Sequence, residues 1–91
     1  MFTKYQSLPK QVEAVQFTDL NKNQVFNSLT GQYAADFEDD NPIIKVTTIH
    51  GEIAIVRFGD WIVKENKPGY YYPVKDDIFR NSYISCDTMS V

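Results

Sequence analysis

The sequence predicts a small α+β domain in which one short helix packs on an antiparallel sheet of five or six strands. Three observations lead to this prediction. Runs of β-branched and aromatic residues recur along the chain, turn residues separate them, and a single helix-like pattern lies near the N-terminal end. The sheet could instead curl into a partly open barrel, and the periodicity does not choose between the two shapes.

The length of 91 residues is that of one domain, so residues 1–91 are predicted to share one core. Residues 1–10 are polar and include a proline, which favours a loosely ordered lead-in. Residues 87–91 are expected to form a frayed tail. Aromatic residues make up 14% of the sequence, and most of these rings are expected in the core because each buries a large area.

The first strand is predicted at residues 12–17, where apolar residues lie on both faces of an extended chain. This pattern suits a strand that is covered on both sides. Residues 20–30 follow as a short helix. Val25, Phe26 and Leu29 are spaced so that they share one helical face, which must pack on the sheet because three asparagines weaken the helix itself.

The ends of this helix carry their own signals. Thr18 or Asp19 can cap the N-terminus, and Gly31 stands where a left-handed residue would end the helix. Residues 33–42 are then expected to form a connection, with a brief extended piece at residues 33–37.

A β-hairpin is the clearest local signal. Two β-branched runs, residues 43–49 and 52–57, are separated by a His-Gly pair, which favours a two-residue turn of type I′. Such a turn would place Val46 opposite Ile55. It would also put four apolar side chains on one buried face, namely Ile44, Val46, Ile53 and Ile55.

Three shorter elements complete the predicted sheet. Residues 61–64 and 70–74 are expected to be strands, joined by a turn at residues 66–69. Pro73 favours an edge position for the second of these strands, because proline has no N–H to donate to a neighbour. Residues 83–86 are expected to return as a last short strand.

A single helical turn is predicted at residues 76–81, before that last strand. Asp76 or Asp77 can cap the turn, and Ile78 and Phe79 can anchor it to the sheet.

The residue inventory argues against catalysis. His50 is the one histidine and Cys86 the one cysteine, so an internal disulfide is impossible and a zinc site lacks its usual ligands. The sequence contains neither a glycine-rich phosphate loop nor a nucleophile elbow. We therefore expect a protein that is not an enzyme and that uses no cofactor and no metal.

The charge and the hydropathy of the sequence argue against two classes of partner, nucleic acids and membranes. Nine Lys and Arg against twelve Asp and Glu give a net charge of −3 without a basic patch, so nucleic acid is not an expected partner. The densest acidic run, at residues 36–40, is expected to be a solvated loop. A membrane partner is not expected either. The lack of disulfides, of a signal peptide and of a run of about 20 apolar residues favours the cytoplasm.

Two segments, residues 59–63 and 70–79, carry more special residues than a scaffold needs. The structural interpretation is a tight turn into a strand for the first and an ion pair between Lys75 and Asp77 in the second. The alternative is a pocket or docking surface. Its candidate binding residues are Asp60, Trp61, Tyr70, Tyr71, Tyr72, Lys75 and Asp77.

At these two segments the chain resembles a family of small proteins of tailed bacteriophages and prophages. The family has a first strand like residues 12–17, then a helix, a Pro-Gly-Asp-Trp/Tyr-Ile motif, a Tyr-Pro-x-Lys-Pro-Asp-Ile-Phe motif and a tyrosine. The corresponding residues are Phe58-Gly59-Asp60-Trp61-Ile62, Tyr72-Pro73-Val74-Lys75-Asp76-Asp77-Ile78-Phe79 and Tyr83. Phe58 and Asp76 stand where the family has proline, so two turns are less constrained here.

The resemblance implies a phage or prophage origin and a role in the host cytoplasm during infection, and it brings no active site. We expect an accessory protein that forms a homo-oligomer and binds a host or phage protein without catalysis. The tyrosine run beside an edge-like strand motivates this expectation. Two alternatives stay open. One is sequestration of a small nucleotide such as an immune signal, with Tyr and Trp stacking on bases. The other is a minor virion or assembly component.

Overall fold

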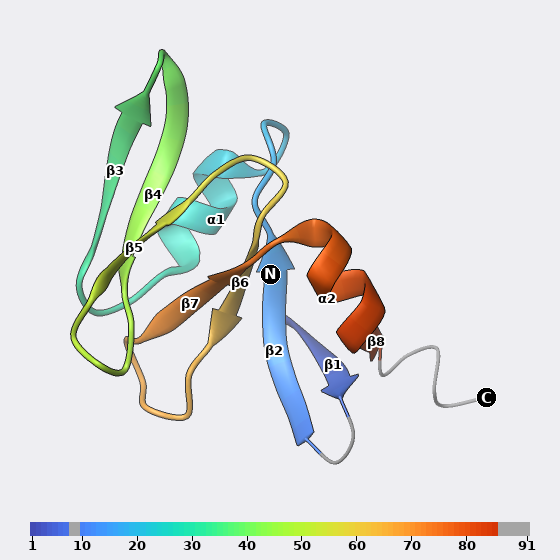
Figure 1. The fold of residues 1–91 in the computed structure, drawn as a ribbon. Coiled ribbons are helices and arrows are strands. Elements are labelled where there is room, and N and C mark those ends of the chain that lie inside the picture. The colour runs from blue at the N-terminus through green and yellow to red at the C-terminus, as the bar shows by residue number, and fades with distance from the viewer. Residues whose placement is uncertain (8–9, 86–91) are drawn as a thin grey trace.

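The computed structural model describes residues 1–7 and 10–85, and it confirms the predicted α+β class with antiparallel strands. Within those residues the elements follow in the order β1-β2-α1-β3-β4-β5-β6-β7-α2-β8 (Figure 1). The described strands form two sheets and not one, and a second helix is present.

The larger sheet, sheet A, has the strand order β7-β6-β2-β1-β8. Every neighbouring pair in it is antiparallel, and β7 lies at an edge as Pro73 predicts. Its strands are β1 Thr3–Ser7, β2 Lys10–Gln16, β6 Trp61–Lys64, β7 Tyr71–Val74 and β8 Ile84–Ser85. The expected loose lead-in is therefore a strand at residues 3–7, which pairs with β2 along its whole length.

The smaller sheet, sheet B, has the order β3-β4-β5. Its strands are β3 Tyr33–Glu38, β4 Asn41–Thr47 and β5 Ile53–Val56. The expected connection at residues 33–42 is thus a hairpin, and its extended piece is a full strand. The turn at its tip is Asp39-Asp40, with φ of 50° and 64°, which is the positive φ that a type I′ turn requires at both positions.

The tip of the β3–β4 hairpin gives a first testable prediction. Asp40 adopts a φ of 64°, a region that costs an ordinary residue about 1–2 kcal/mol and glycine almost nothing. We expect Asp40→Gly to raise the free energy of unfolding by about 0.5 kcal/mol and Asp40→Ala to lower it by a similar amount. Urea denaturation measures both. An alanine variant more stable than the glycine variant would contradict the turn geometry.

The β4–β5 hairpin is present, but the predicted two-residue turn is wrong. The loop has three residues, 49–51, because the Thr48 N–H donates to the Glu52 carbonyl at 2.8 Å and the Gly51 N–H donates to the Thr48 carbonyl at 2.9 Å. Gly51, with φ of 83°, supplies the left-handed residue of a three-residue hairpin loop.

This loop shifts the strand register by one residue. Val46 pairs with Ala54 instead of Ile55. Because side chains alternate along a strand, the shift turns Ile53 and Ile55 away from the core, and Ile53 is 71% exposed. Of the four apolar side chains predicted on the buried face, only Ile44 and Val46 are buried.

Helix α1 spans Lys22–Ser28, which is shorter than the predicted range at both ends. Its N-cap residue is Asn21, so neither Thr18 nor Asp19 occupies the cap position. The Asn21 carboxamide oxygen accepts hydrogen bonds from the Thr18 N–H at 2.9 Å and hydroxyl at 3.0 Å, while its NH₂ donates to the Gln16 carbonyl at 2.8 Å. These bonds fix the helix to the end of β2.

Helix α2 spans Asp76–Ser82 and is longer than the single predicted turn. Asp76 and Asp77 lie in its first turn, after the cap position. Of the two predicted anchors, Phe79 is buried at 2% exposure, whereas Ile78 is 55% exposed. Of these two side chains, only the Phe79 ring therefore anchors the helix to the sheet.

Sheet A is covered on both faces, as the apolar pattern of residues 12–17 predicts. On one face a cluster, here the α1 cluster, joins it to α1 and sheet B; its buried members are Val15, Phe17, Val25, Leu29, Ile44, Val46, Val56, Ile62 and Tyr71. On the other face the α2 cluster joins it to α2; its buried members are Val12, Ala14, Trp61, Val63 and Phe79. Alternate residues of the same strands supply the two clusters.

Candidate functional site

The seven candidate binding residues do not form one surface. Tyr71 is buried in the α1 cluster, where its hydroxyl accepts a hydrogen bond from the Thr30 N–H at 3.0 Å. Trp61 lies on the opposite face of sheet A, in the α2 cluster, with its ring stacked on Phe79 at 4.0 Å between centroids. These two rings fill the core and are closed to a partner.

Tyr70 and Tyr72 are both half-buried, but they contact different neighbours. Tyr70 precedes β7, and the Lys67 ammonium lies 4.9 Å from its ring centroid. Tyr72 packs against the α2 cluster. Burial, and secondly a hydrogen bond with Tyr83, raises the pKa of the Tyr72 phenol from its ordinary value of 10.0.

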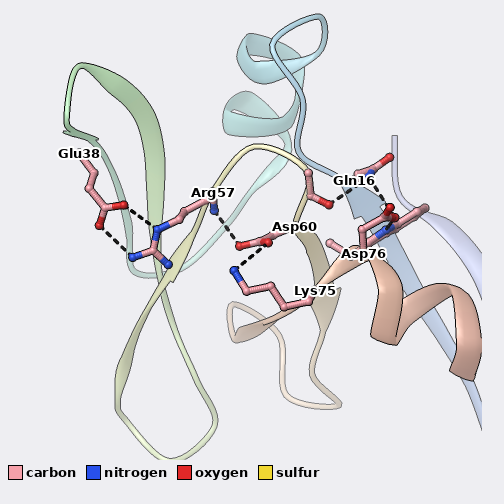
Figure 2. A network of polar contacts seen from close by, with 8 residues as sticks. Gln16, Glu38, Arg57, Asp60, Lys75 and Asp76 are labelled. Carbon is pink, nitrogen blue, oxygen red and sulfur yellow. Dashed lines mark hydrogen bonds and ion pairs between the residues drawn. The ribbon is translucent and has the colours of Figure 1, made fainter.

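Asp60 and Lys75 are brought together, with 3.4 Å between the Lys75 ammonium and the Asp60 carboxylate (Figure 2). Asp60 is buried, and its other carboxylate oxygen accepts a hydrogen bond from the backbone N–H of Arg57 at 3.0 Å. Its backbone carbonyl accepts the Phe17 N–H at 2.9 Å. The carboxylate thus closes the turn between β5 and β6. Lys75 has this partner instead of the expected Asp77, which is exposed.

The same network continues toward the tip of sheet B. The Arg57 guanidinium donates two hydrogen bonds to the Glu38 carboxylate, at 2.6 Å and 2.9 Å, and so joins the end of β5 to the end of β3 (Figure 2). This pairing lowers the pKa of Glu38 and raises the pKa of Arg57. Both charges are therefore satisfied within the protein.

Asp76 is the junction between α2 and sheet A. One of its carboxylate oxygens accepts hydrogen bonds from the Trp61 indole N–H at 2.8 Å, the Arg80 guanidinium at 2.8 Å and the Gln16 amide at 3.2 Å. The bond from Trp61, followed by that from Arg80, lowers the pKa of Asp76 from its ordinary value of 3.8.

This junction predicts a pH dependence of stability. A carboxylate whose pKa is lower in the folded state stabilises the fold fully above pH 3.8 and loses that contribution as the pH falls toward its folded pKa. We expect Asp76→Asn to lower the melting temperature at pH 7 and to lose less than the wild type on acidification to pH 3. Calorimetry at both pH values measures this difference. An equal loss in both proteins would contradict the assignment, because Asp36 and Glu38 remain in each.

A separate feature, here called the groove, lies between α1 and the inner face of the β3–β4 hairpin, which stand side by side in Figure 1. It has a volume of about 300 Å³ and a mainly apolar lining. Phe37, the last lining residue before the tip of the hairpin, is 70% exposed. The other apolar lining residues are Phe17, Phe26, Ala35, Pro42, Ile43 and Ile44.

The charges around the groove are mostly paired. Lys22, on the helix side, forms an ion pair with Asp19 at 2.8 Å, and Asp36, on the hairpin side, forms one with Lys45 at 2.9 Å. The exposed tip residues Asp39 and Asp40 have no ion-pair partner within the part of the chain that the structure describes.

The sequence does not predict this groove, although the strand on one side of it, β3, has a recognisable pattern. Tyr33, Ala35 and Phe37 are apolar at every second position, which is the pattern of a half-buried strand. Two aspartates follow, and either can adopt a positive φ. The acidic run at residues 36–40 therefore divides between the end of β3 and the turn at Asp39-Asp40.

His50 is the one histidine and Cys86 the one cysteine of the chain. His50 lies exposed in the β4–β5 loop, and Cys86 lies outside the described residues. Within residues 1–7 and 10–85, no group of three or more metal-ligating side chains is placed to hold an ion. Neither described helix has the length or the apolar character to cross a membrane. Comparisons with protein-family models, curated proteins and solved structures gave no match for this chain.

Proposed function

We propose that this protein is a phage or prophage accessory protein that binds a host or phage protein without catalysis, and that the groove is its binding surface. The phage origin rests on the three motifs of the sequence. The binding surface rests on one observation: Phe37 extends an apolar groove and stays 70% exposed. Exposed apolar surface that continues into a concavity marks interaction sites in soluble proteins.

The buried residues of the two sequence segments make their contacts inside the protein, and this favours the groove as the binding surface. Asp60, Trp61 and Tyr71 each hold the fold together through contacts inside the protein. Phe37, in contrast, forms no aromatic stack among the described residues and contributes little to the core. A large ring that is not needed for folding is available for a partner.

The test compares three tagged forms of the protein as baits in extract of phage-infected host cells. These are the wild type, Phe37→Ala and the matched control Ile53→Ala, which removes an equally exposed apolar side chain from the outer face of the same sheet. We expect at least one protein to be retained by the wild type and the control and depleted with Phe37→Ala. Binding of that purified protein to the three forms then confirms a direct contact.

Retention that is identical for all three forms, or the absence of any retained protein, would contradict the groove as a docking surface. The expected homo-oligomer stays a prediction. Size-exclusion chromatography with light scattering tests it, and a monomer at tens of micromolar would count against it.

A second candidate function, nucleotide sequestration, has one supporting observation. A cavity of about 310 Å³ lies between the end of α1 and the β6–β7 turn, lined by Tyr70, Lys64 and Lys67 among others. Glu13 and Glu65 line it too and oppose phosphate binding. A ligand at 100 times its dissociation constant stabilises a protein by about 2.7 kcal/mol, so a thermal-shift panel of cyclic dinucleotides at millimolar concentration tests this candidate. No shift would remove it.

A further inference from the structure

We infer that the partner segment that enters the groove is basic: a large apolar side chain lies between α1 and Phe37, with a lysine or arginine beside Asp39 and Asp40. This inference rests on the proposed function and adds the chemistry of the partner. It follows from the size of the groove, the state of the neighbouring strand edge and the charges at the hairpin tip.

The size of the groove limits what can occupy it. Its volume of about 300 Å³ lies at the lower end of the range of about 300–1,000 Å³ for ligand pockets in proteins. This is room for one or two side chains and not for a helix laid along its length. The lining offers aromatic and aliphatic surface and few polar groups, so the entering side chain is apolar.

The edge of β3 argues against strand addition as the binding mode. The turn at Asp39-Asp40 makes Glu38 and Asn41 a hydrogen-bonded pair, so the backbone groups of Phe37 point to the free edge. The Phe37 N–H is already bonded to the Asp36 carboxylate at 2.8 Å. A strand that pairs at Phe37 would have to displace that bond, so side-chain contacts in the groove are the favoured mode at this end of the edge.

The charges give the sign of the partner. The groove's own lysine, Lys22, is neutralised by Asp19, and Asp36 by Lys45. Asp39 and Asp40 are left as two exposed carboxylates without a described ion-pair partner, two and three positions after Phe37 at the hairpin tip. Electrostatic complementarity therefore selects a cation on the segment that contacts Phe37.

A second copy of the chain is the less favoured occupant. Each copy carries a net charge of −3, and a symmetric contact at the groove would bring the acidic tips of both copies toward the same interface. Like charges in this arrangement oppose association.

A random peptide library selected on the purified protein provides probes of this inference. We expect the selected peptides to contain an aromatic or large aliphatic residue with Lys or Arg within a few positions. Fluorescence anisotropy then measures the affinity of one selected peptide for the wild type and four variants. Circular dichroism verifies that each variant is folded.

The variants separate the apolar from the charged contribution. Phe37→Ala should weaken binding at least about tenfold, and Ile53→Ala less than about twofold. The double variant Asp39→Asn with Asp40→Asn keeps the positive φ accessible and should weaken binding about fivefold at low salt, with little difference at about 1 M salt. Its control, Glu52→Gln with Asp77→Asn, removes two exposed charges away from the groove and should leave binding unchanged.

The outcomes distinguish the basic character of the partner from binding at the groove itself. Acidic or uncharged selected peptides, or tight binding that responds to Phe37→Ala and not to the Asp39 and Asp40 changes, would overturn the basic partner and leave groove binding in place. If the wild type forms a dimer that Phe37→Ala dissociates, a second copy of the chain occupies the groove, and the basic partner is overturned. Selected peptides that bind regardless of Phe37, or no selected peptide at all, would contradict the groove itself.

Discussion

Gly31→Ala is expected to lower the free energy of unfolding by about 3 kcal/mol. A Cβ atom at Gly31 would lie 2.5 Å from the carbonyl oxygen and 2.7 Å from the Cα of Gly69. Both are backbone atoms, so no side chain can rotate to relieve the overlap. Gly31 also has φ of 80°, a conformation that costs alanine about 1–2 kcal/mol by itself.

Gly51→Ala is the matched control for this prediction. Gly51 has nearly the same φ, 83°, but nothing lies within 4 Å of its added Cβ. We expect it to lose only the conformational cost, about 1 kcal/mol. Urea denaturation of both variants measures the difference. Equal losses would show that the segment after α1 and the β6–β7 turn do not meet closely.

Phe79→Ala is expected to lower the free energy of unfolding by about 4 kcal/mol, because a fully buried phenylalanine leaves a cavity when it is truncated. Phe79 stacks on Trp61 at 4.0 Å and on Tyr83 at 4.7 Å, and it meets the edge of Tyr5 at 4.9 Å. A domain of this length has about 5–13 kcal/mol in total. The loss is therefore a large fraction of it.

Ile78→Ala is the control within the same helix. Ile78 is 55% exposed, so its truncation should change stability by less than about 0.5 kcal/mol. The fluorescence of Trp61 reports the local effect of Phe79→Ala, since that indole stacks on the lost ring. Similar losses from the two changes would mean that α2 is held by its whole surface and not by one ring.

Most strands of the fold could be predicted from the sequence because their apolar residues are periodic. Residues 12–17 show apolar residues on both faces, and β2 is indeed covered by a cluster on each side. Strand β1 has no such pattern. Its pairing with β2, a tertiary contact, makes it a strand.

The register of the β4–β5 hairpin could not be predicted because two loops suit the same residues. A glycine at position 51 can supply the positive φ of either a two-residue or a three-residue loop. The two choices differ by one residue and exchange the faces of Ile53 and Ala54. In the observed register Ala54 and Val56 are the residues of β5 that pack in the α1 cluster.

The candidate site was harder to predict than the fold. Large rings at positions 61 and 71 are equally consistent with a core and with a contact surface, and only the three-dimensional arrangement buries them. The groove depends on the distance between α1 and a hairpin that are separate in sequence. Local patterns contain no information on that distance.

The placement of sheet B within the chain has a consequence for the kinetics of folding. Its three strands are consecutive in the chain. A two-residue turn, Asp39-Asp40, and a three-residue loop, 49–51, join them, so the loop-closure entropy of their pairing is small. Sheet A instead pairs β2 with β6 and β1 with β8, across all of sheet B. We therefore expect sheet B to form early and to draw β2 and β6 together, so that changes at the Asp39-Asp40 turn alter the rate of folding more than the rate of unfolding.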